Sequence, residues 1–172
     1  MPPIGPEEAA DADAVEALID RAFGPGRHAK AAERLREGRR PIPGLSLVAR
    51  ADGTVVGCAR LWAIAIGEAP AVLLGPFAVE AAFRARGLGA ALIGAACDAA
   101  QRGGHGLVLL VGDESYFAPL GFAAEPARGV IMPGPVDRRR VLVRALRPGA
   151  AEGLAGAVRP AASLPRASLR HG

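Results

Sequence analysis

The chain has few cysteines, few aromatic residues and almost no lysine. Its two cysteines, Cys58 and Cys97, lack C-x-x-C or Cys/His spacing, so we expect buried thiols, with no disulfide framework and no metal site. Aromatic residues make up 4% of the sequence, which is few for the stacking surfaces that bind single-stranded nucleic acid. No apolar run approaches the roughly 18 residues of a membrane span, and the N-terminus is acidic where a secretory signal would be basic. We therefore expect a cytoplasmic protein that binds no membrane.

The positive charge comes almost entirely from arginine. Lysine and arginine together number 21 against 17 acidic residues, and Lys30 is the single lysine. A basic balance can indicate nucleic-acid binding, but these arginines are scattered and no nucleic-acid-binding signature is present. We therefore expect no nucleic-acid partner, because an anionic ligand accounts for the same balance.

The length of 172 residues and the 51% hydrophobic content suit one globular domain, which we place over residues 1–160, followed by a C-terminal tail over 161–172. Apolar periodicity predicts helices at 10–23, 29–37 and 88–102, and a short helix capped by Asp113 or Ser115. Alternating or continuous apolar runs predict strands at 45–50, 55–66, 72–79 and 107–111, from Phe122 onward, and at 141–146. The dipeptide Asp52-Gly53 predicts a hairpin turn between the strands at 45–50 and 55–66.

The most informative stretch is residues 73–102, which we interpret as a strand, a glycine turn and a helix. Gly87 and Gly89 remove two Cβ atoms where the helix begins, so a ligand can lie against its first unpaired N–H groups. Such an N-terminus carries partial positive charge and binds phosphate well. Pro76 cannot donate to a strand ladder, which predicts a bulge at Gly75-Pro76.

The pattern Arg84-x-x-Gly87-x-Gly89 resembles the acetyl-CoA motif of the GNAT N-acetyltransferase superfamily. A second block, residues 116–122, resembles the family's Y-x-x-x-G-F segment and follows at the matching distance. The resemblance covers residues 20–160 and is greatest for a bacterial subgroup of predicted N-acetyltransferases. It implies an α/β (α+β) fold with a mixed, mostly antiparallel, centrally splayed sheet flanked by about four helices.

The same resemblance implies an acetyl-CoA-dependent N-acetyltransferase that moves an acetyl group directly to a primary amine of a small molecule or protein. Acetyl-CoA would be the co-substrate, and loops over residues 24–44 and 129–140 would shape the acceptor site. A homodimer through a late apolar strand is also compatible with the family. The resemblance places the coenzyme against Phe77, Ala78, Val79, Arg84, Ala85, Arg86, Gly87, Leu88, Gly89 and Ala90.

The acid that protonates the leaving thiolate departs from the family pattern. The usual tyrosine position holds Phe117, and phenylalanine has no proton to give. Tyr116, the sole tyrosine, comes one position earlier, which on a helix is a rotation of about 100°. Three alternatives remain: Tyr116 acts after a local shift, water supplies the proton, or catalysis is impaired. In the last case the chain is a catalytically weak or inactive acyl-CoA-binding sensor of the same fold.

Candidates for the general base are also few. Asp113 and Glu114 lie near a strand end and could act through water, although a helix cap is the simpler role for Asp113. An amine of modest pKa could instead lose its proton to solvent. The remaining candidates have simpler interpretations as surface, loop or tail residues: Glu68, Glu80, His28, His105 and His171.

Overall fold

The structure is a computed structural model, and it describes residues 1–24 and 31–162. Within these residues the α-helices are α1 (Ala12–Phe23), α2 (Leu88–Arg102) and the single turn α3 (Glu114–Phe117). The strands are β1 (Ile4–Pro6), β2 (Leu47–Ala51), β3 (Thr54–Ile66), β4 (Ala69–Val79), β5 (Leu107–Val111), β6 (Gly129–Ile131), β7 (Val141–Ala145) and β8 (Ala155–Pro160). No helix in the described ranges is long and apolar enough to cross a membrane.

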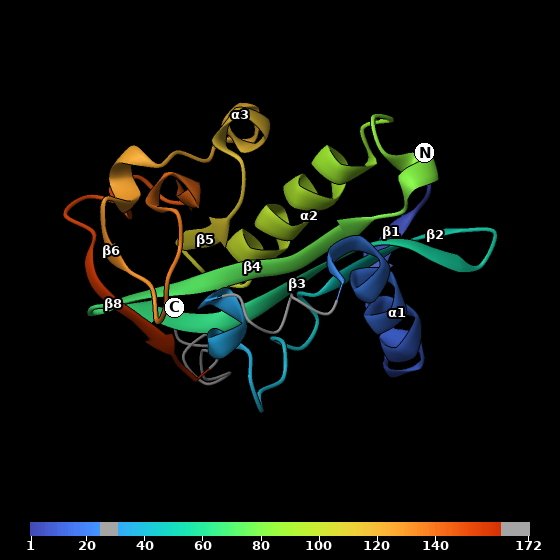
Figure 1. The fold of residues 1–172 in the computed structure, drawn as a ribbon, viewed down its shortest axis with the longest axis horizontal. Helices are drawn as coiled ribbons and strands as arrows, with labels where there is room; N and C mark the ends of the chain where they lie inside the picture. The colour runs from blue at the N-terminus through green and yellow to red at the C-terminus, as the bar shows by residue number, and fades with distance from the viewer. Residues whose placement is uncertain (25–30, 163–172) are drawn as a thin grey trace.

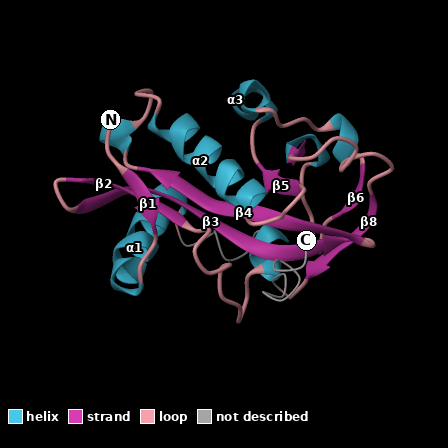
Figure 2. Ribbon diagram, turned by 180° about the vertical axis from the view of Figure 1, so that it is seen from behind, coloured by secondary structure: helices cyan, strands magenta, loops and turns pink. Residues whose placement is uncertain are grey.

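The strands form one sheet in the order β1-β2-β3-β4-β5-β7, with β8 paired to β3 and to β6. Only the β4–β5 and β6–β8 pairs are parallel, so the expected mixed and mostly antiparallel sheet is confirmed. The long strands β3 and β4 cross the whole molecule, with α2 on one face and α1 on the other (Figures 1 and 2).

Two of the helices cover the sheet because their apolar residues recur at helical spacing. In α1 the buried residues Val15, Leu18 and Ile19 pack against β2 and β3. Helix α2 lies close to the sheet at Gly57 of β3, since a Cβ placed there would lie 2.7 Å from Leu92 Cδ1 of the helix. The core therefore has two layers, one on each face of β3 and β4.

The sheet opens between β4 and β5. Their ladder includes only the pairs Val72–Val108 and Leu73–Leu109, while β4 continues to Val79 paired to β3 alone. On the β3 side the register shifts between Ala59 and Leu61, which leaves Gly75 and Pro76 opposite Arg60. The bulge predicted from Pro76 and the central splay are both confirmed, because β4 changes course where its proline has no N–H to donate.

Other sequence expectations need correction. The segment after Phe122 forms only the isolated bridge Ala123–Val143, because the left-handed Gly121 and a turn at Glu125–Ala127 leave too little extended chain. The second expected helix is a 3₁₀ turn at Ala31–Leu35, and residues 29 and 30 lie outside the described residues. The described residues form three α-helices and several 3₁₀ turns, which agrees with the expected sheet flanked by about four helices. Most of the expected 161–172 tail is likewise outside the described part.

Candidate functional site

The open edge of β4 presents main-chain donors toward the gap beside β5. The N–H of Glu80 donates to Val56 O on β3 at 2.8 Å. Because successive residues of a strand point their N–H groups to opposite sides, the N–H groups of Phe77 and Val79 point away from β3. The carbonyl of Val79 faces the same way and accepts a hydrogen bond from Arg84 Nε at 3.0 Å. An extended ligand in the gap could therefore bond to this edge as an added strand would.

The edge leads directly into a turn that suits an anion. Gly87 caps α2 with φ of 84°, and Ala85 is one of two non-glycine residues with positive φ among the described residues. The N–H of Ala91 makes a 3.0 Å bond to Gly87 O, so the N–H groups of Leu88, Gly89 and Ala90 lie before the first full helical bond. Together with the helix dipole, such donors are chemically suited to phosphate groups.

The space above this turn admits no side chain at Gly89. A Cβ built there would lie 2.4 Å from the Tyr116 hydroxyl oxygen and 3.2 Å from Phe77 Cζ. A Cβ at Gly87 would lie 3.5 Å from Met1 Cε and would also have an unfavourable backbone conformation. The glycines thus let the helix terminus, the open strand and Tyr116 approach one another.

A cavity of about 950 Å³ joins these features, and its volume suits a large ligand. Of the ten residues predicted to contact the coenzyme, Arg86 and Leu88 do not line it. Arg86 lies over the ring of Phe83 at 5.6 Å, and the Leu88 side chain is 1% exposed in the core. The eight that line the cavity are Phe77, Ala78, Val79, Arg84, Ala85, Gly87, Gly89 and Ala90.

Sequence reasoning did not place the individual residues of the other walls at this cavity. One wall is the C-terminal half of α1, with Ile19, Ala22 and Phe23. Another includes Arg36, and a third holds Arg140 from the turn that precedes β7. These residues belong to no motif, and only the folded chain brings them to β4. Arg36 and Arg140 lie in the loops 24–44 and 129–140, which the family resemblance assigned to the acceptor site, although neither arginine was singled out there.

The neighbouring residues Tyr116 and Phe117 lie in different surroundings. Phe117 is buried, with edge-on ring contacts to Phe77 at 6.2 Å, to Tyr116 at 4.8 Å and to Phe122 at 6.0 Å. Tyr116 is 45% exposed, and its hydroxyl lies over Gly89 inside the cavity. The offset of one position therefore does not turn Tyr116 away, because α3 is a single turn whose Phe117 ring contacts Phe77 of β4. Burial raises the pKa of Tyr116, so its phenol stays protonated at neutral pH.

The candidate bases mostly have structural partners. Asp113 lines the cavity but accepts the N–H of Ser115 at 3.2 Å, which confirms the helix-cap interpretation. Glu114 accepts the N–H of Ala124 at 2.7 Å, and Glu80 pairs with Arg21 of α1, so Glu80 is not simply a solvated charge. Glu68 is exposed in the turn between β3 and β4. Of these four carboxylates, Asp113 alone lines the cavity.

The structure shows the burial of one histidine and of both cysteines. His105 is 9% exposed, so the expected surface position is wrong; burial, with a smaller contribution from the Arg147 charge, lowers its pKa. His28 and His171 lie outside the described residues. Cys58 and Cys97 are free and buried as predicted, and burial raises the pKa of Cys58 to about 12.

The sequence matches the Acetyltransferase (GNAT) family over residues 12–122. The GNAT family N-acetyltransferase YhbS from Escherichia coli, solved in complex with CoA, is 26% identical with a TM-score of 0.79, over 93% of this chain and 89% of that one. A GNAT family acetyltransferase from Brucella melitensis, solved in complex with acetyl-CoA, is 24% identical with a TM-score of 0.69, over 95% of this chain and 97% of that one. No curated protein matches the sequence.

Proposed function

This chain belongs to the GNAT family of acetyltransferases, and we propose that it moves an acetyl group from acetyl-CoA directly to a primary amine. The observation that carries the proposal is the continuous path from the open edge of β4 to the glycine turn at the start of α2. The edge offers two main-chain donors to an extended arm, and the turn offers helix N-terminal donors to a diphosphate. CoA and acetyl-CoA in the two similar structures support the same substrate.

The residues of this chain would contribute three effects to the transfer. One N–H group of the open β4 edge, that of Phe77 or of Val79, would donate to the acetyl carbonyl oxygen as negative charge develops on it, and the other would bond to the extended arm. The walls of the cavity would hold the thioester beside the amine, which removes the entropic cost of their encounter. As the new C–N bond forms and the C–S bond breaks, the Tyr116 hydroxyl would give its proton to the departing thiolate, and solvent would take the proton of the amine.

The binding site can be tested at Gly89, with Gly94 of the same helix as a matched control. We expect Gly89→Glu to weaken acetyl-CoA binding at least about 100-fold, because a carboxylate would enter the space meant for phosphate. Gly94→Glu should bind normally, because a Cβ there meets nothing within 4 Å. Isothermal titration calorimetry gives both affinities, and thermal melting checks folding. Equal affinity of the two variants would refute the site.

A second candidate function follows from the burial of Phe117 at the usual tyrosine position. In that case the chain is a sensor that binds acyl-CoA but transfers the acyl group poorly or not at all. Coenzyme release measured against a panel of primary amines separates the two functions. Tight acetyl-CoA binding with no release on any amine favours the sensor, whereas turnover favours the enzyme.

A further inference from the structure

A second cavity of about 700 Å³ adjoins the first one. Its walls come from the segment before α1, the first half of α1, the loop over residues 33–46 and the middle of β3. Arg36 and Pro76 line both cavities, so the two meet at the bulge where β4 leaves β5. A molecule in the second cavity would thus lie next to the open end of the proposed acetyl-CoA site.

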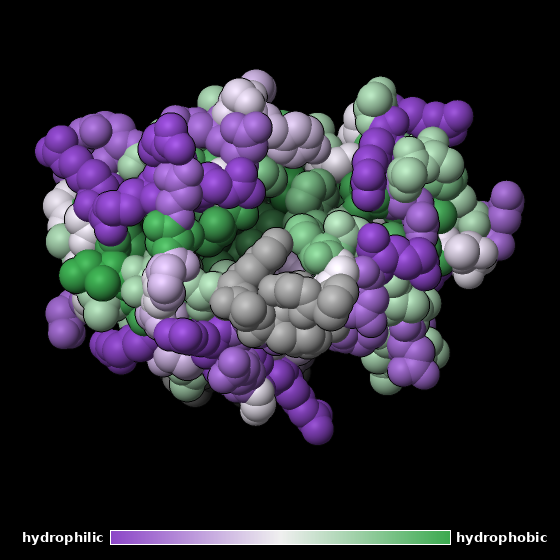
Figure 3. Space-filling model, in the orientation of Figure 1, coloured by the Kyte–Doolittle hydropathy of each residue, from purple (hydrophilic) through white to green (hydrophobic). Residues whose placement is uncertain are grey.

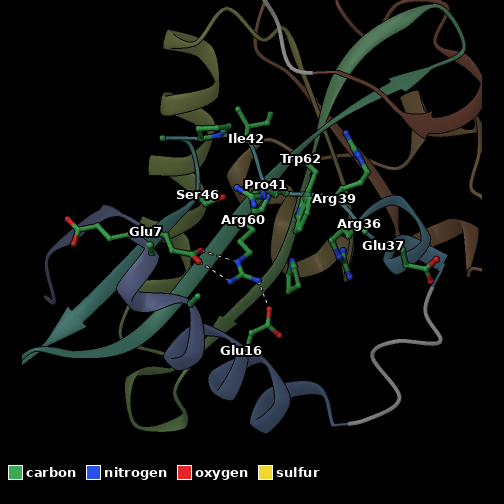
Figure 4. A pocket seen from close by; sticks show the side chains of 18 of the residues that line it. Glu7, Glu16, Arg36, Glu37, Arg39, Pro41, Ile42, Ser46, Arg60 and Trp62 are labelled. Atoms are coloured by element: carbon green, nitrogen blue, oxygen red, sulfur yellow. Dashed lines mark hydrogen bonds and ion pairs between the residues drawn. The ribbon is translucent and has the colours of Figure 1, made fainter.

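The second cavity contains a buried cluster of charged side chains (Figure 4). Arg60 of β3 is 7% exposed, and Glu7 accepts two of its hydrogen bonds, from Nε at 3.0 Å and from Nη2 at 2.9 Å. Glu16 of α1 accepts a third, from Nη1 at 2.7 Å. Burial alone would lower the pKa of Arg60, but the hydrogen bonds of both glutamates raise it, so the guanidinium stays charged.

The two carboxylates that contact Arg60 differ in how far they are exposed. Glu7 is largely buried, with 11% of its side chain exposed, and its bidentate contact satisfies one side of Arg60. Glu16 has 45% of its side chain exposed and borders the cavity, so its carboxylate can meet a ligand while Arg60 fixes its position. Figure 4 shows Arg60 turned toward Glu7 and Glu16 and away from Arg36 and Arg39.

The two cavities differ in the sign of their charged linings. Five glutamates and four arginines of the described residues line the second cavity, which leaves one negative charge. Three arginines and two aspartates line the first, which leaves one positive charge. This separation suits an anionic coenzyme in one cavity and a cation in the other.

The charged cluster is also fixed to the bulge. Arg60 stands opposite Gly75 and Pro76 in the β3–β4 register, and Trp62, two residues along β3, donates its indole N–H to Gly75 O. A ligand held by Glu16 would therefore be connected, through Arg60 and Trp62 of β3, to the bulge of β4. Strand β4 is the one that presents the Phe77 and Val79 donors. Such a rigid connection is what alignment of two substrates requires.

We infer that the second cavity receives the acceptor and that Glu16, positioned by Arg60 and Glu7, binds the ammonium group of a cationic amine of small-molecule size. The inference rests on the proposed acetyl-CoA site, since it gives the second cavity a role only if the thioester lies beside the bulge. It makes Glu16 a specificity-determining residue.

Three CoA derivatives test this inference without an acceptor being known. The sulfur carries an alkyl tail long enough to pass Pro76, ending in an ammonium, a methyl or a carboxylate group. We expect the ammonium derivative to bind about tenfold more tightly than the methyl derivative, and the carboxylate derivative no more tightly than the methyl one. Calorimetry on the full-length protein gives the three dissociation constants.

Variants then assign the preference to one carboxylate. Glu16→Gln should abolish the ammonium preference, and Glu16→Asp should keep part of it. Glu37 is an exposed glutamate on the loop side of the same cavity, and Glu37→Gln should leave the preference intact. Equal binding of the three derivatives, a carboxylate preference, or equal loss in Glu16→Gln and Glu37→Gln would overturn the inference. Failure of all three to bind would instead contradict the proposed acetyl-CoA site itself.

Discussion

At the scale of single residues, the cavity depends on which of two neighbouring aromatic side chains faces it. Phe117 fills the space between Phe77 and Phe122, and this leaves Tyr116 at the surface of the cavity with its hydroxyl above Gly89. The hydroxyl is the one phenolic group of the chain. Its position at the junction of β4 and α2 supports the proposal that Tyr116 protonates the leaving thiolate.

Removing this hydroxyl should affect chemistry and not coenzyme binding. We expect Tyr116→Phe to lower kcat about 100-fold if Tyr116 is the acid, with an unchanged Kd for acetyl-CoA, because the ring contact to Phe117 is kept. Since burial raises the pKa of Tyr116, the wild-type rate should fall only as pH rises past the ordinary value of 10.0. Steady-state kinetics and calorimetry check both. An unaltered kcat would remove Tyr116 from the mechanism.

At the scale of elements, the bulge in β4 makes the site. One residue of β3, Arg60, faces two residues of β4, and beyond them β4 is free of β5 and offers its N–H groups to a ligand. Trp62 holds this geometry from the neighbouring strand by its bond to Gly75 O. Because the bond is buried, its loss should cost more than the loss of a solvent-exposed hydrogen bond.

Substituting Trp62 should therefore weaken both folding and coenzyme binding. Trp62→Phe removes the indole donor, and we expect a loss of about 1–3 kcal/mol in the free energy of unfolding and weaker acetyl-CoA binding. Ile64→Val is the matched control, because Ile64 is buried on the same strand opposite Ala71, away from the bulge. It should cost about 1 kcal/mol and leave binding unchanged. Urea unfolding and calorimetry distinguish them; normal binding by Trp62→Phe would show that the bulge persists without this bond.

At the scale of the whole molecule, Arg60 connects parts of the chain that are distant in sequence. It joins the segment before α1 through Glu7, α1 itself through Glu16, and the centre of the sheet through its own strand. The first cavity lies along the C-terminal half of α1 and the second along its N-terminal half. The position of α1 on the sheet therefore shapes both cavities at once.

Loss of the guanidinium should destabilise the whole domain. We expect Arg60→Met to lower the free energy of unfolding by about 3–5 kcal/mol, because it leaves the Glu7 carboxylate buried without its partner. The double variant Glu7→Leu/Arg60→Met should recover part of this loss, since it removes the unpaired charge as well. Urea unfolding of the two variants measures the difference. A double variant less stable than Arg60→Met would contradict the charge-burial explanation.

The sequence by itself determined the features whose cause lies within a few residues. Asp52-Gly53 sets the hairpin turn because both residues adopt positive φ, and Pro76 sets the bulge because it has no N–H. Gly87 and Gly89 set the start of α2 in the same local way. The tertiary structure alone decided the direction of Tyr116, the burial of Arg60 and the second cavity, since these depend on segments that meet only after folding. The short strands β6 and β8 formed for the same reason: their ladders come from their partners and not from their own weak apolar patterns.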